Sequence, residues 1–238
     1  MLHNGVFPLP KAIQKVLQMG AEEMRRPVEI EFAVNLRPDR TGEFYLLQIR
    51  PMVDNRMSIN VNLADIPDSE CLLRSANAIG HESSSDISDI IYVKTADYTP
   101  HDNPLIAAEI DKINSKLLNQ GRHCIYIGPG RWGSSDPWLG IPVKWPNISA
   151  ARLIVEAGLG SYQVDPSQGT HFFQNLTSLG VSYLTINAFK GEGVYDEASL
   201  NAMPAEEESA HLRHIHTDQP LTVMVDGLHR QAVVKLNR

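Results

Sequence analysis

Apolar residues recur at helical spacing near the start of the chain and then change to alternation. In residues 9–26 they fall on one helical face, and Pro27 ends the helix. Residues 28–36 (VEIEFAVNL) and 43–49 (EFYLLQI) are rich in β-forming side chains, and the polar segment RPDRTG between them is typical of a hairpin loop. We therefore predict a helix followed by a β-hairpin.

Strict alternation assigns the side chains of this hairpin to its two faces. It places Glu29 and Glu31 together on one face of the first strand and groups Phe44, Leu46 and Gln48 on one face of the second. Carboxylate and amide oxygens suit Mg²⁺, which prefers oxygen ligands together with substrate phosphates. The pattern alone favours a plain solvated face, with a metal-binding cleft as the alternative.

The rest of the chain mixes strand and helix patterns. The clearest helix is residues 103–119, with Gly121 closing it. A further helix is expected at residues 170–180. The polar residues 191–209 are expected to form a surface loop that contains one short helix. Strands are predicted at residues 87–94, 124–127, 152–156 and 181–187, with a terminal hairpin at 221–226 and 231–236. The fold class is α/β of the mixed, α+β kind.

Composition restricts the class of protein. A chain of 238 residues holds one large domain or two small ones. Its formal charge of -7 argues against nucleic acid or an anionic membrane as partner. Cys71 and Cys124 both lie among apolar residues, which suits free thiols in a reducing compartment. No apolar run approaches the roughly 18 residues of a membrane span. We expect a cytoplasmic protein.

A glycine-rich loop within residues 124–145 (CIYIGPGRWGSSDPWLGIPVKW) carries the most distinctive chemistry. Glycines allow backbone amides to approach a ligand, and arginine and hydroxyls beside them are typical of anion binding. The interpretation as a tight turn between two strands is equally favoured. The candidate anion-binding residues are Gly128, Gly130, Arg131, Gly133, Ser134, Ser135, Asp136 and His171.

Two common nucleotide motifs are excluded for this loop. Residues 128–133 read G-x-G-x-x-G, but Pro137, Pro142 and Pro146 prevent the helix that a dinucleotide-binding fingerprint requires. No Gly-Lys-Ser/Thr follows, so the loop is not a phosphate-binding P-loop.

Histidines near the C-terminus form a second candidate. His211, His214 and His216 lie close together in sequence, and such tracts can bind metal. Because only the first two would share a helical face, we predict an exposed, solvated cluster. His171, beside two phenylalanines, is a packing residue or a ligand in an anion or metal site.

The hairpin resembles a known nucleotide-binding segment. PVEIEFAVNL followed by EFYLLQIRPM is similar to the end of the ATP-grasp domain of phosphoenolpyruvate synthase and pyruvate phosphate dikinase, over about residues 10–53. The family's first strand reads acidic-Ile-Glu-aromatic, and Glu31 matches its Glu. The second strand reads Leu-Gln-x-Arg, and Gln48 and Arg50 match its Gln and Arg. The resemblance implies that Glu31 and Gln48 hold Mg²⁺ and ATP. It implies a catalytic role for Arg50, which would stabilise the transferred phosphate.

The same resemblance predicts the domain organisation. Residues 1–58 would end an ATP-grasp domain, and residues 59–238 would form a mixed-sheet α/β C-terminal domain. In the family the glycine-rich lobe that holds the nucleotide lies upstream, so we expect the C-terminal part of a longer ATP-dependent phosphotransferase (kinase), inactive alone. The expected partners are that upstream lobe, the nucleotide and a small phosphorylated or carboxylate substrate. A homo-oligomer is an open alternative.

The later part of the chain has weaker resemblances. Residues 123–187 resemble the C-terminal region of large bacterial proteins related to phosphoenolpyruvate synthase. Leu-Gly-Ile-Pro at 139–142 resembles the family's phosphohistidine domain, so residues 71–145 would be a divergent form that lacks the histidine. The alternatives are a small-anion-binding or regulatory module using residues 128–136, and a scaffold or dimerisation domain with Trp132 and Trp138 in the contact.

Overall fold

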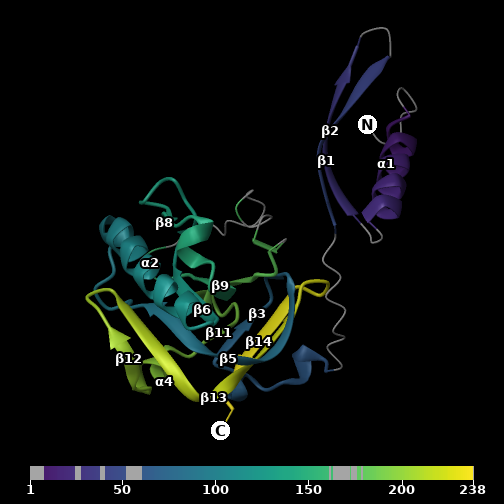
Figure 1. Ribbon diagram of the computed structural model, residues 1–238. Coiled ribbons are helices and arrows are strands. Elements are labelled where there is room, and N and C mark those ends of the chain that lie inside the picture. The colour runs from purple at the N-terminus through teal and green to yellow at the C-terminus, as the bar shows by residue number, and fades with distance from the viewer. Residues whose placement is uncertain are drawn as a thin grey trace. The chain divides into compact units, whose positions relative to one another are not determined.

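The chain divides into two compact units, Met1–Arg56 and Met57–Arg238 (Figure 1). In this computed structural model, the described residues are 8–24, 28–37, 41–51, 61–160, 162, 172, 176–177 and 179–237. None of the helices in these ranges combines the length and apolar character that crossing a lipid bilayer requires.

The first unit is a helix packed on a hairpin, as the pattern predicted. Helix α1 (Leu9–Met24) precedes the antiparallel strands β1 (Val28–Leu36) and β2 (Gly42–Pro51). Gly20 allows the helix to approach the sheet, because a Cβ there would lie 2.4 Å from Ile49 Cδ1 and 2.9 Å from Val28 Cγ2. The Val28 face of the hairpin therefore packs against α1.

A β-bulge corrects the predicted faces of the second strand. Glu31 pairs with Gln48, but the next residue, Phe32, pairs with Leu46, so the ladder skips one residue of β2. A bulge reverses the alternation of the side chains beyond it. Phe44 therefore shares a face with Phe32, on which it stacks at 5.1 Å, and the grouping of Phe44 and Leu46 with Gln48 was wrong.

The second unit is built on a 10-stranded mixed sheet, in agreement with the predicted fold class. Strands β5, β6, β9 and β10 are parallel neighbours, and the other pairings are antiparallel. The order is β11-β3-β14-β13-β5-β6-β9-β10-β4, with β12 on β13. The strands are β3 (Leu73–Ser75), β4 (Ala78–Ile79), β5 (His81–Val93), β6 (Cys124–Pro129), β9 (Ala151–Ala157), β10 (Ser182–Ile186), β11 (Val194–Tyr195), β12 (Ala205–Glu208), β13 (Leu212–Asp226) and β14 (Gln231–Lys235).

Helices and several short elements accompany the sheet. The α-helices with defined bounds in the described part of this unit are α2 (Asn103–Asn119) and α4 (Glu197–Ala202), and β7 (Arg131–Trp132) pairs in parallel with β8 (Gly140–Ile141). The 3-10 turns are η1 (Leu63–Asp65), η2 (Asp68–Glu70), η3 (Pro100–Asp102), η4 (Trp145–Ile148) and η5 (Ala188–Lys190). Most of the helix predicted at residues 170–180 lies outside the described residues.

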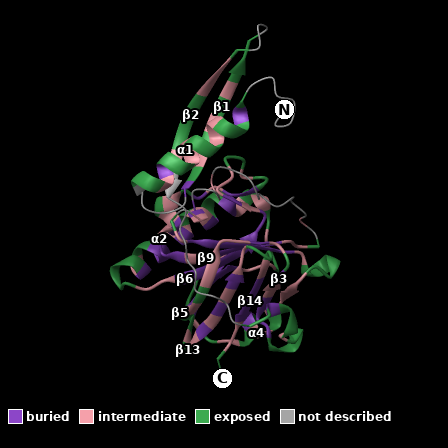
Figure 2. Ribbon diagram, turned by 90° about the vertical axis from the view of Figure 1, so that its right-hand side faces the viewer, coloured by how far each residue is buried: buried purple, intermediate pink, exposed green. Residues whose placement is uncertain are grey.

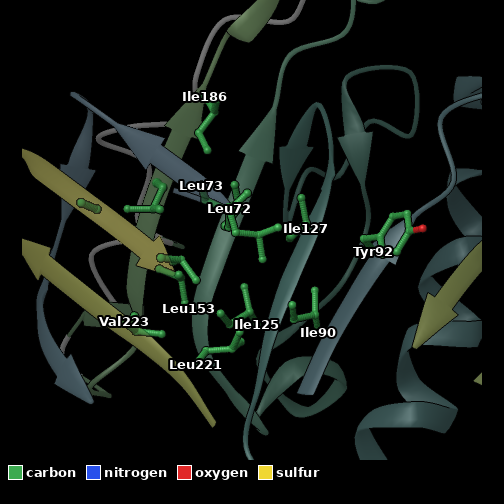
Figure 3. Close-up of a cluster of buried hydrophobic side chains, with 14 of the residues drawn as sticks. Leu72, Leu73, Ile90, Tyr92, Ile125, Ile127, Leu153, Ile186, Leu221 and Val223 are labelled. Atoms are coloured by element: carbon green, nitrogen blue, oxygen red, sulfur yellow. The ribbon is translucent and has the colours of Figure 1, made fainter. Parts of the chain in front are cut away.

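The large sheet curls until its two ends meet. Strands β3 and β4 lie near opposite ends of the strand order, yet they follow one another in the chain. The amide of Thr185 donates to the carbonyl of Asn77 at 3.0 Å, and the Ser75 hydroxyl donates to the carbonyl of Thr185 at 2.6 Å. Inside the curl lies a cluster of buried apolar side chains that includes Leu73, Ile90 and Leu153 (Figure 3).

Helix α2 covers the opposite face of the parallel strands (Figures 1 and 2). Its buried stripe, which includes Ile106, Ile110 and Leu117, packs with Tyr126 of the sheet. The helix ends as predicted at Gly121, which has a φ of 65°. The amide of Arg122 donates to the carbonyl of Leu117 at 2.9 Å, as in a Schellman motif.

Candidate functional site

The exposed face of the first hairpin brings together the residues singled out by the resemblance. Glu31 lies directly opposite Gln48, and Glu29 lies opposite the backbone of Arg50. Both glutamates are exposed, whereas Val28 on the other face is buried. The Arg50 side chain lies outside the described residues.

In the described part of the chain, the side chains of Glu29, Glu31 and Gln48 on this face are exposed. Paired residues of an antiparallel ladder have Cβ atoms about 5 Å apart, so a carboxylate and an amide oxygen can reach the same cation. Mg²⁺ prefers one or two carboxylates together with phosphate oxygens. The arrangement can therefore hold a Mg²⁺ ion between Glu31, Gln48 and a bound phosphate.

The glycine-rich loop contains two short strands, β7 and β8, which pair in parallel. Gly130 and Gly133 adopt left-handed backbone conformations, with φ of 68° and 76°. A Cβ at Gly130 would lie 2.8 Å from the Leu139 carbonyl oxygen, and one at Gly133 would lie 2.6 Å from the Phe172 ring. These two glycines are therefore required by the turn itself and by close packing.

Much of the loop backbone is hydrogen-bonded within the protein. The amides of Arg131 and Gly133 donate to the carbonyls of Leu139 and Ile141, both at 2.9 Å. The Trp132 amide donates to the buried Glu156 carboxylate at 3.1 Å. These amides are not available to an anion, and Glu156 places a carboxylate at the Trp132 amide.

The anion-binding interpretation consequently depends on fewer groups. It now rests on the Arg131 side chain and on the backbone of Ser134 and Ser135, and it stays a prediction. His171, also assigned to this site, lies outside the described residues. Trp132 is 1% exposed and cannot form a chain-to-chain contact, whereas Trp138 is 64% exposed.

The histidine tract differs most from its prediction. It lies at the start of strand β13, not on a helix, and His214 is completely buried. Its Nε2 lies 2.7 Å from Asp89 Oδ1, and His216 Nδ1 lies 3.2 Å from the same oxygen. The prediction of an exposed, solvated cluster was therefore wrong for His214. Strand pairing of β13 with β5 creates this contact between residues far apart in sequence.

Arg122 completes a polar cluster around Asp89. Its Nε donates to Asp89 Oδ2 at 2.9 Å, and its Nη2 donates to Asp89 Oδ1 and, at 2.7 Å, to Glu206 Oε2. Burial alone would raise the pKa of Asp89, but hydrogen bonds from His214 and Arg122 and the guanidinium charge lower it to about 2. The hydrogen bond from Arg122 likewise lowers the pKa of Glu206 to about 2.

This cluster has the spacing of a metal site but already contains a cation. Single ligand atoms of Asp89, Glu206 and His216 lie within 4.8 Å of one another. The Nη2 of Arg122 contacts all three residues and lies 2.8 Å from His216 Nδ1. Because the guanidinium supplies the positive charge that the carboxylates require, we interpret the cluster as an internal ion-pair lock that joins the α2–β6 connection to β5, β12 and β13.

No model of a protein family, no curated protein and no solved structure matches this chain.

Proposed function

We propose that the first unit forms the Mg²⁺- and phosphate-binding edge of an ATP-grasp nucleotide site. The parent activity would be that of an ATP-dependent phosphotransferase (kinase) related to phosphoenolpyruvate synthase and pyruvate phosphate dikinase. The supporting observation is the register of the hairpin, in which Glu31 faces Gln48 on the exposed side. Without the bulge that breaks strict alternation, Gln48 would share a face with Phe44.

Each residue would have a distinct role in this site. Glu31 and Gln48 would ligate Mg²⁺ through their side-chain oxygens, which suit a hard cation. Arg50 would contact the phosphates and stabilise negative charge during transfer. The buried free thiols Cys71 and Cys124 support a cytoplasmic setting for the reaction.

The unit would act together with a second lobe. In the proposed family a separate glycine-rich lobe holds the nucleotide, so the present chain should bind Mg²⁺ and ATP only weakly. It should not transfer phosphate by itself. Phosphoryl transfer depends on positioning from both sides of the nucleotide, and one face cannot provide it.

Paramagnetic NMR provides a direct test on the full 238-residue chain. Mn²⁺ with ATP replaces Mg²⁺ and broadens the amide signals of residues near the bound ion. We expect selective broadening around Glu31 and Gln48. The variant Glu31→Gln should need at least about fivefold more Mn²⁺ and ATP for the same effect, because a charged ligand is lost. Glu23→Gln, on the exposed surface of α1, is the matched control.

The result can contradict the proposal clearly. Broadening that is absent from the hairpin, or unchanged by Glu31→Gln, would show that this face does not bind the metal-nucleotide complex. Equal effects of the Glu31 and Glu23 substitutions would indicate only general attraction of Mn²⁺ to an acidic protein.

A further inference from the structure

A pocket of about 490 Å³ lies in the second unit, at the carboxyl end of strand β5. It is bounded by the segment that follows β5, by the first turns of α2 and by the residues just before β13. Its size falls within the range of small-molecule sites, about 300–1,000 Å³. Ligands of α/β proteins bind preferentially outside the carboxyl ends of parallel strands. Apart from His211 of the histidine tract, no residue of this pocket belongs to the sites described above.

One wall carries an oriented histidine. His211 lines the pocket, and its Nδ1 lies 2.9 Å from Glu109 Oε1. The Ser209 hydroxyl donates to the other oxygen of Glu109 at 2.6 Å. Because a carboxylate only accepts hydrogen bonds, His211 Nδ1 is the donor to Glu109, and this contact holds the imidazole ring at the pocket wall.

Two carboxylates line the pocket, and its lysine is already paired. Asp97 is exposed, and Asp102 accepts a hydrogen bond from the Thr99 hydroxyl at 2.9 Å. That hydrogen bond is the main cause of the lowered pKa of Asp102, which keeps the carboxyl ionised near neutral pH. The Lys94 ammonium donates to the Ser209 carbonyl at 2.8 Å and to Glu208 at 3.2 Å. The charges available to a ligand are therefore mainly negative.

The start of α2 does not offset this negative charge. The 3-10 turn η3 runs directly into the helix and satisfies the amides at their junction. The Asp102 amide donates to the Thr99 carbonyl at 3.1 Å, and the Asn103 amide donates to the carbonyl of Pro100. These two amides are therefore not open to an anion. The apolar side chains of Val93 and Ile106 also line the pocket.

We propose that this pocket binds a small organic ammonium ion. The ammonium group lies between Asp97 and Asp102, while its alkyl chain contacts Val93 and Ile106. A cation with a short apolar body matches acceptors beside an apolar wall better than a neutral or anionic molecule does. The inference does not rest on the proposed phosphotransferase function.

A titration of the full chain with propylammonium, followed by amide NMR shifts, tests this site. We expect saturable shifts confined to residues 94–102 and 210–211. Two probes of similar length, the neutral 1-butanol and the anion butyrate, should produce shifts at least about fivefold weaker there, because they lack the ion pair. Asp97→Asn and Asp102→Asn should each raise the dissociation constant about fivefold. The control Asp65→Asn, at an exposed aspartate of η1, should not.

Several outcomes would overturn the proposal. Equal shifts with butyrate or 1-butanol would remove the charge selectivity, and shifts outside the named segments would place binding elsewhere. Unchanged affinity in both aspartate variants would exclude the carboxylates. Because Asp102 begins a helix, its variant counts only if the rest of its spectrum is unaltered. The exposed Asp97 provides the independent measurement.

Discussion

The two units of this protein use their polar residues in opposite ways. Among the described residues of Met1–Arg56, the buried hydrophobic side chains are Leu9 and Val28, and the acidic residues of β1 face outward. In Met57–Arg238, extensive apolar clusters fill both sides of the sheet, and Asp89 and His214 are sealed into an ion-pair lock. A two-stranded hairpin is marginally stable by itself, and packing against a helix such as α1 is one way to stabilise it.

This contrast separates stability from candidate function. The second unit gains its free energy of folding from the burial of apolar side chains. Its internal charged groups therefore serve mainly to connect one secondary-structure element to another. Among its described residues, the first unit has few buried side chains and carries Glu29 and Glu31 on an exposed face. Substitutions of the buried groups of the second unit should therefore cost more stability than substitutions on the exposed hairpin face of the first unit.

The largest effect is expected inside the curled sheet. Leu153→Ala removes a fully buried side chain, and we expect a loss of about 4 kcal/mol in the free energy of unfolding. Tryptophan fluorescence during urea denaturation measures the second unit alone, because Trp132, Trp138 and Trp145 all lie there. Leu118→Ala, at an exposed leucine of α2, is the control and should cost less than about 1 kcal/mol.

Amide hydrogen exchange of Ile30 in the same Leu153 variant would sharpen the comparison. If the hairpin exchanges at the wild-type rate while the second unit is destabilised, the two units are energetically separate. Faster exchange at Ile30 would show instead that the hairpin depends on the larger core.

The ion-pair lock should come next in magnitude. Arg122→Met leaves Asp89 buried without its main cation, and we expect the second unit to lose about 3 kcal/mol. Adding Asp89→Asn should restore part of that loss, because the uncompensated charge disappears. Urea unfolding of the two single variants and the double variant gives the coupling energy. A coupling near zero would contradict the lock.

Acid should produce the smallest of these changes. The folded-state pKa of Asp89, about 2, lies below its ordinary value of 3.8, so the unfolded chain binds the proton more readily. The resulting stability, roughly 2 kcal/mol, is complete above about pH 4 and is lost as pH falls towards 2. Unfolding measured between pH 5 and pH 2 should show a shallower slope in Asp89→Asn. An identical slope would refute the contribution of Asp89.

Local signals in the sequence predicted the elements well. Helix α2 was predicted with the observed bounds because its apolar stripe and Gly121 act within one segment. The hairpin of β1 and β2 was predicted for the same reason. The pairing of Glu31 with Gln48 required the bulge, and no turn residue in YLLQ signals it.

Non-local pairing explains what the sequence did not reveal. His214 resembles a surface histidine until β13 pairs with β5 and places it beside Asp89, more than 100 positions away. The oriented pair of His211 and Glu109 also depends on two separate elements. An alternation signal was present at Leu212, His214 and His216, and reading the tract as a strand would have placed these side chains on one face.

The closure of the sheet has a consequence for synthesis on the ribosome. Ser75 of β3 pairs with Ala232 of β14, and 157 positions separate them. At about 5–20 residues per second, translation needs roughly 8–30 seconds to produce the second strand after the first. During that interval Leu72 and Leu73 lack strand β14, whose side chains form one side of the apolar cluster in which both leucines are buried. The nascent chain therefore exposes an apolar segment until β14 is made, which is the situation in which chaperones bind.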